Sequence, residues 1–110
     1  MRPTSRTPSL PKSLKVGADT YSIAELASET ALVAGIRGFC DKHHHAIRVA
    51  LDGSPAEARN TLFHEALHAV FADGYLHGTE GEETIVSVLS NRLLALFRDN
   101  ATFRDYVLAP

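Results

Sequence analysis

A helical stretch bounded by a start signal and a stop signal limits the fold more than any other part of the chain. The segment Ser54–Glu57 places a serine cap, a proline at the first helical position and a glutamate three residues after the cap, which predicts that a helix begins there. The helical pattern continues to Phe71 or Ala72, and the Asp73-Gly74 pair predicts its end. Apolar residues surround the second half of this stretch on nearly every side, so we expect the helix to be buried.

Two histidines and a glutamate interrupt the apolar helix as an H-E-x-x-H motif, formed by His64, Glu65 and His68. Residues four apart share one face of a helix, so the two imidazoles lie about 6 Å apart and suit one zinc ion. Glu65 lies beside that face and can act as a general base toward water. The alternative is a pair of core histidines hydrogen-bonded to neighbours. We favour a metal site, because each unpaired buried polar group costs about 1–3 kcal/mol.

A catalytic zinc usually has three protein ligands, so a third ligand is expected after the motif. Glu82 and Glu83 open a second amphipathic helix, which must pack against the first to bury both apolar faces. Glu82 lies near the middle of the apolar stripe and could instead complete a capping box with Thr79. Glu83 lies at the edge of the stripe, and Ser87, four residues on, could hold its carboxylate. We predict Glu83 as the third ligand, with Glu82 and His77 as open alternatives.

The start of the chain predicts an arm and a hairpin. Residues 1–13 contain three prolines and three basic residues, so we expect a disordered arm, followed by one domain over residues 14–110. A turn at residues 17–19 would join two short strands into a hairpin. The apolar positions of this hairpin, which we expect to be buried, are Val16, Tyr21 and Ile23.

The next part of the chain predicts two more strands. Residues 24–34 fit either a full-length helix or a helix that ends early. Residues 35–40 and 45–51 instead predict two strands joined by a turn. The run His43–His45 belongs to this turn, and we expect it to be exposed, because neighbouring strand residues point to opposite faces and cannot all hold one ion. Cys40 has no second cysteine nearby and is expected to be a small buried residue.

The C-terminal part of the chain predicts a helix over residues 82–97 and a final short helix capped by Asn100. We expect the short helix to face Phe103, Tyr106 and Val107 inward. The order of elements predicts a small α+β domain. In it, a short antiparallel or mixed sheet packs on the motif helix and on the helix that carries Glu82 and Glu83.

Composition and charge exclude several classes of function. At 110 residues and a formal net charge of -2, the chain is one small domain with no sign of a nucleic-acid partner. A single cysteine allows no internal disulfide. No apolar run approaches about 20 residues, and no secretory signal opens the chain, so we expect a cytoplasmic protein without a membrane partner.

The motif and the downstream glutamate together resemble the minimal gluzincin class of zinc metallopeptidases. The nearest members are the ImmA/IrrE-type proteins and small phage or prophage zincins. These share the order strand, motif helix, loop and Glu-bearing helix, and the resemblance covers about residues 35–98. Their glutamate ligand is followed by a polar residue at +4, here Ser87, where the ImmA/IrrE pattern often has Asn or Asp. A second family, the SprT-like proteins, uses a His-Gly pair that His77-Gly78 resembles, but the Phe expected soon afterwards is missing.

The resemblance implies a zincin-like fold and zinc-dependent hydrolysis of a peptide or protein substrate. His64, His68 and Glu83 would hold Zn²⁺, and Glu65 would be the general base. Tyr75 or His77 could stabilise the oxyanion, and the strand over residues 45–51 could pair with substrate if it lies at a sheet edge. The alternative function is a non-enzymatic domain in which zinc stabilises a zincin-fold scaffold or interaction domain.

Overall fold

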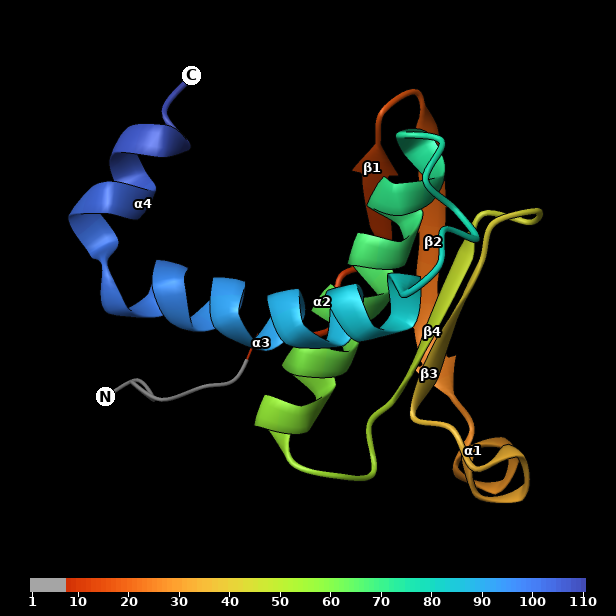
Figure 1. Cartoon of the computed structure of the whole chain (residues 1–110). Coiled ribbons are helices and arrows are strands. Elements are labelled where there is room, and N and C mark those ends of the chain that lie inside the picture. Colours follow the sequence, from red (N-terminus) through yellow and green to blue (C-terminus); the bar gives the residue numbers. More distant parts are fainter. Residues whose placement is uncertain (1–7) are drawn as a thin grey trace, which may run out of the picture.

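The computed structural model describes residues 8–110, which form a four-stranded sheet and four helices (Figure 1). The sheet has the strand order β1-β2-β4-β3 and is mixed, because β2 and β4 are parallel while the other two pairs are antiparallel. The predicted α+β class is confirmed. The elements in chain order are β1 Ser13–Val16, β2 Asp19–Leu26, α1 Ser28–Ala34, β3 Gly38–Asp41, β4 Ala46–Ala50, α2 Pro55–Asp73, α3 Glu82–Asp99 and α4 Ala101–Val107.

The predicted hairpin is formed by β1 and β2, which turn at Gly17 with a φ of +61°. Val16, Tyr21 and Ile23 are buried in one core cluster together with Ile47 and Val49 of β4, as expected. Strand β2 continues to Leu26, three residues past the predicted hairpin, because residues 22–26 pair in parallel with residues 46–50. A helix then follows only from residue 28.

The first residues that the structure describes lead directly into the sheet. Strand β1 begins at Ser13, and the carbonyl of Lys12 already accepts a hydrogen bond from the backbone N–H of Ile23 at 2.9 Å. Leu10 packs against the main core cluster. Residues 1–7 of the predicted arm lie outside the described residues.

Strand β4 lies inside the sheet and β3 forms one of its edges. The predicted strand over residues 45–51 therefore cannot receive a substrate strand, since β4 is already paired with β2 on one side and β3 on the other. Two large apolar residues of this region are partly exposed to solvent. Phe39 and Leu51 are 36% and 40% exposed, respectively.

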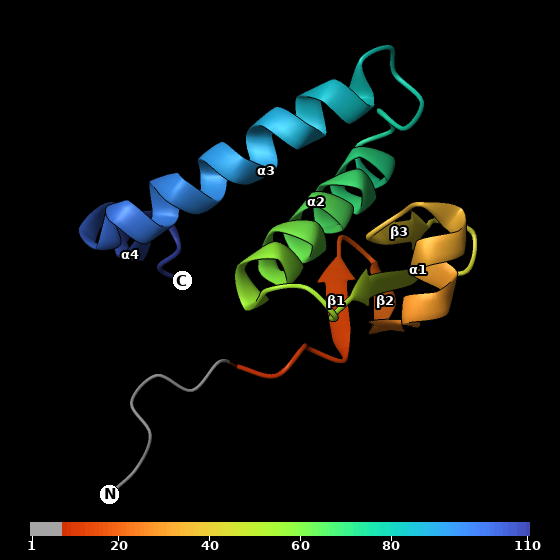
Figure 2. The same ribbon diagram turned by 90° about the horizontal axis from the view of Figure 1, so that it is seen from below.

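Helix α2 packs across the sheet and carries the capping box predicted at its start. The Ser54 hydroxyl accepts from the Glu57 N–H at 3.1 Å, and the Glu57 carboxylate accepts from the Ser54 N–H at 2.9 Å. Helix α3 packs against α2 and lies on the side of it away from the sheet (Figure 2), and Figure 1 shows α3 crossing α2. Only Glu65 and Ala69 of α2 are fully buried, and Val70 is half-exposed, so the expectation of a helix buried on all sides is wrong.

Helix α3 begins without the second capping box that the sequence suggested. Gly81 is its N-cap, with a φ of +82° and no side-chain hydrogen bond to the helix. Positive φ favours glycine because it has no Cβ, and the turn that delivers α3 therefore depends on this residue. The carboxylate of Glu82 is used elsewhere, as described below.

Helix α4 contacts chiefly α3 and projects away from the sheet (Figure 1). It buries no residue, and Phe103, Tyr106 and Val107 are all exposed. The predicted inward orientation of these three side chains is thus wrong, since no helix or strand within residues 8–110 covers them. Asn100 stands at the N-cap position, but its amide donates back to the Leu96 carbonyl instead of capping α4. Among the helices over residues 8–110, none has the length and apolar content needed to cross a membrane.

Candidate metal centre

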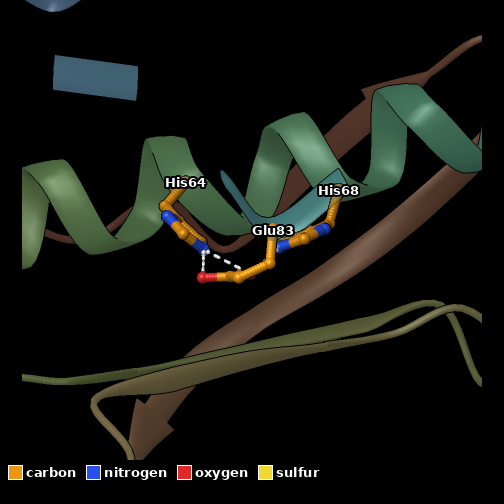
Figure 3. A group of neighbouring side chains, drawn as sticks. All are labelled: His64, His68 and Glu83. Atoms are coloured by element: carbon orange, nitrogen blue, oxygen red, sulfur yellow. Dashed lines mark hydrogen bonds and ion pairs between the residues drawn. The ribbon is translucent and has the colours of Figure 1, made fainter. Parts of the chain in front are cut away.

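His64, His68 and Glu83 meet where α2 and α3 contact each other (Figure 3). Each offers one ligand atom, and these atoms all lie within 4.8 Å of one another. The two imidazoles project from one face of α2, with ring centroids 5.0 Å apart, and the carboxylate comes from the first turn of α3. The structure thus brings together the three side chains predicted as ligands.

The spacing of these atoms fits a tetrahedral ion. For metal–ligand bonds of about 2.0–2.1 Å, the edge of a tetrahedron is roughly 3.4 Å long. The Glu83 carboxylate lies 2.8 Å from Nε2 of His68 and 3.2 Å from Nε2 of His64. Both distances are somewhat shorter than this edge, so a small widening of each would admit an ion, and the donor set fits Zn²⁺ in both chemistry and geometry.

Glu82 fixes the orientation of the His68 ring. Its Oε2 accepts from Nδ1 of His68 at 2.6 Å, and its Oε1 accepts from the Gly78 N–H at 2.7 Å. The Glu82 side chain is only 10% exposed. Although burial raises the pKa of Glu82, the hydrogen bonds from His68 and Gly78 outweigh it and lower the pKa below its usual value. Because Glu82 holds Nδ1, Nε2 is the nitrogen of His68 that faces Glu83 and that could bind a metal.

Glu83 stands at the rim of the centre, with a side chain that is 71% exposed. Burial raises its pKa, but the hydrogen bond from His68, the charge of His64 and the hydrogen bond from Ser87 outweigh that effect and lower the pKa. The Ser87 hydroxyl donates to Oε2 at 3.2 Å, the contact expected for the residue at +4. A proton on Nε2 of His68 makes its 2.8 Å contact with Glu83 a hydrogen bond, and a metal ion bound between the two groups would take the place of that proton.

Glu65 lies in the same hollow as two of these groups. The hollow has a volume of about 260 Å³, and its lining residues are Ile36, Arg37, Gly38, Asn60, Thr61, His64, Glu65 and Glu83. Strand β3 passes so close to α2 here that a Cβ on Gly38 would lie 2.7 Å from Thr61 and 3.6 Å from Glu65. Burial raises the pKa of Glu65, partly offset by the charges of His64 and His68.

The other residues singled out in the sequence lie elsewhere. His77 is outside the ligand cluster, and its Nδ1 lies 3.7 Å from the Glu82 carboxylate. Tyr75 is almost fully exposed. Neither residue lines the hollow that holds Glu65. In the run His43–His45, the first two residues are exposed as expected, but the third is partly buried, with its ring centroid 5.1 Å from that of Tyr21. Cys40 is half-buried against the core, and burial raises the pKa of its thiol to about 11, so it is protonated at neutral pH.

Sequence reasoning missed Arg37 and Asn60, which also line the hollow. A signal for Asn60 was present, since it precedes His64 by four residues and therefore shares the face of α2 that carries both histidines. No comparable signal marked Arg37, which reaches the hollow through the packing of the loop before β3. A larger apolar hollow of about 470 Å³ lies between residues 8–11 and the first turns of α2, and it includes none of the candidate ligands.

Replacing Glu82 with alanine is expected to weaken zinc binding about 10- to 100-fold, because the His68 ring loses the carboxylate that sets its tautomer. Glu82→Gln retains an acceptor oxygen, so its affinity for zinc should lie between those of the original chain and the Glu82→Ala variant. Competition with a zinc-chelating dye measures the affinities, and circular dichroism checks the fold. Glu80→Ala, which removes an exposed carboxylate two residues earlier, is the matched control. Equal affinities of the Glu82→Ala variant and the original chain would contradict the assigned role.

Comparison with known proteins gives no family to which the chain can be assigned: no protein-family profile, curated protein or solved structure matches it.

Proposed function

We propose that the chain is a zinc-dependent metallopeptidase, in which His64, His68 and Glu83 hold the ion and Glu65 is the general base. The observation that carries the proposal is the convergence of two imidazoles and one carboxylate, with a buried glutamate in the adjoining hollow. Three protein ligands leave one position of a tetrahedral ion open, as catalytic zinc requires and structural zinc does not.

Bound zinc would supply a Lewis acid that polarises the scissile carbonyl and lowers the pKa of water. Glu65 takes the proton from the attacking water, whose oxygen forms a bond to the carbonyl carbon. It then returns this proton to the amine nitrogen as the C–N bond breaks. The raised pKa of Glu65 supports this role, since a base whose pKa lies nearer neutrality can also act as the acid.

The substrate would bind as an extended strand beside β3. This strand is an edge of the sheet, packs against α2 and begins at Gly38, a residue that lines the hollow with Glu65. An edge strand offers free backbone donors and acceptors to a peptide, which supports main-chain recognition and an endopeptidase reaction. Arg37 and Asn60 replace Tyr75 and His77 as candidate donors to the developing oxyanion, because they line this hollow.

Metal removal tests the proposal. The zinc-loaded chain is expected to cleave an unfolded protein such as casein. Treatment with a chelator should reduce cleavage to background, and added Zn²⁺ should restore it, because no other group in the hollow can polarise the carbonyl as strongly. Mass spectrometry of the products measures cleavage at defined peptide bonds. Tight zinc binding without cleavage of any peptide would favour the scaffold alternative.

A further inference from the structure

A further hollow, called the second hollow below, lies next to the one that holds Glu65 and is distinct from the larger apolar hollow. Its volume is about 240 Å³, and it lies between the N-terminal half of α2 and the C-terminal half of α3. Asn60 borders both hollows, so the second one begins one helical turn from His64. The residues that line it are Ala56, Arg59, Asn60, Asn91, Leu94 and Arg98.

The lining of this second hollow is positively charged. Arg59 on α2 and Arg98 on α3 are exposed, and no Asp or Glu lines the hollow with them. Within the described residues 8–110, neither guanidinium forms an ion pair, whereas Arg37 pairs with Asp52 and Arg104 with Asp105. Two like charges that face one hollow without a counter-charge attract an anion, and guanidinium groups suit a carboxylate in particular.

Asparagine side chains add hydrogen-bonding groups on both helices. Asn91 of α3 and Asn60 of α2 each line the second hollow. The carbonyl oxygen of Asn60 is buried and has no hydrogen-bond partner among the described residues. An unsatisfied buried acceptor is unfavourable, so a rotation of this amide toward an incoming N–H group would satisfy it. Asn60 is therefore placed to contact a peptide backbone between the two hollows.

We propose that the second hollow is a specificity site for an acidic side chain of the substrate, which makes acidic peptides the preferred substrate class. The inference rests on the proposed peptidase function. Along α2, Asn60 and Ala56 lie about 6 and 12 Å from His64, at 1.5 Å per residue. An extended peptide advances about 3.3 Å per residue, so the Asp or Glu lies about two to four residues from the cleaved bond.

Peptide binding to the zinc-loaded Glu65→Gln chain tests this inference without requiring cleavage. Fluorescence anisotropy compares labelled peptides that carry Asp at one position with otherwise identical peptides that carry Asn. The position of Asp is varied on both sides of a central bond. We expect the best Asp peptide to bind roughly tenfold more tightly than its Asn counterpart. This preference should shrink as salt is added, because the charges are near the surface.

Variants of the two arginines identify the site. Arg59→Gln and Arg98→Gln should each reduce the preference for Asp, and the double variant should abolish it. Arg92→Gln, which removes an exposed charge of α3 that lines neither hollow, should leave it unchanged. Equal binding of Asp and Asn peptides, or a preference that survives in the double variant, would overturn the inference. So would tighter binding of a phosphoserine peptide than of any Asp peptide, which would assign the hollow to phosphate.

The two proposals fail in different ways. If the zinc-loaded chain cleaves no peptide but the Asp preference depends on Arg59 and Arg98, the peptidase function is wrong and the hollow is an acidic-peptide binding site. If peptides are cleaved with no preference for acidic residues, the peptidase function stands and the specificity site is wrong.

Discussion

Replacing Glu65 with glutamine is expected to slow peptide hydrolysis by about 10²- to 10⁴-fold while zinc remains bound. Glutamine has nearly the shape of glutamate but cannot accept a proton from water. The three ligand side chains are not altered, because Glu65 is not among them. Initial rates of cleavage, measured beside the metal content of the purified variant, separate the loss of the base from the loss of the ion.

Glu25→Gln provides a comparison for this experiment, since Glu25 is an exposed glutamate of β2 that does not line the hollow. It should leave both the stability and the cleavage rate unchanged. If the Glu65→Gln variant cleaves as fast as the original chain, Glu65 is not the base. If it loses zinc, its carboxylate has a structural role that the ligand geometry does not account for.

Replacing His64 with alanine is expected to abolish the stabilisation of the fold by zinc. A ligand that binds only the folded state contributes about 4 kcal/mol when its concentration is a thousand times its Kd. For a domain of this size, that corresponds to roughly 15 °C or more in Tm. Two ligands remain in the variant, and their affinity for zinc is too low for such a shift. Thermal unfolding with and without added zinc measures the effect.

His44→Ala is the matched control, because His44 is an exposed histidine that lies in the turn before β4 and outside the cluster. This variant should show the same zinc-dependent rise in Tm as the original chain. A full rise in the His64→Ala variant would refute the assignment of His64 as a ligand, and with it the metal centre.

Local signals in the sequence were sufficient to predict α2. The serine cap, the proline after it and Glu57 all act within one helical turn, and the structure contains the capping box that they predict. The spacing of His64 and His68 is also local, because any helix places them on one face. The start of the helix and the side-by-side arrangement of its histidines therefore followed from the sequence.

Elements that depend on distant partners could not be predicted in the same way. Residues 24–26 have side chains that favour a helix, yet they extend β2, because β4 pairs with them from more than 20 residues away. The apolar residues of α4 suggested an inward face, but such a pattern says nothing about whether another element is there to receive it.

The choice between Glu82 and Glu83 depends on the rotation of α3 relative to α2, which the turn over residues 74–81 sets. Two neighbouring glutamates differ by about 100° around a helix. The structure gives Glu83 the Nε2 side of His68 and Glu82 the Nδ1 side, so both contact the same ring in different roles. The sequence had suggested a capping role or a ligand role for Glu82, and it could not suggest the contact with Nδ1 of His68, because that contact exists only after the helices pack.

Because α4 has no buried side chains, it should unfold locally before the sheet does. Few contacts oppose local fraying of α4, whereas opening β4 would expose Ile47 and Val49, which are completely buried. Backbone amides of α4 should therefore exchange with deuterated solvent long before those of the sheet. The chain would show two regimes of hydrogen exchange, with the slow regime centred on the strands beneath α2.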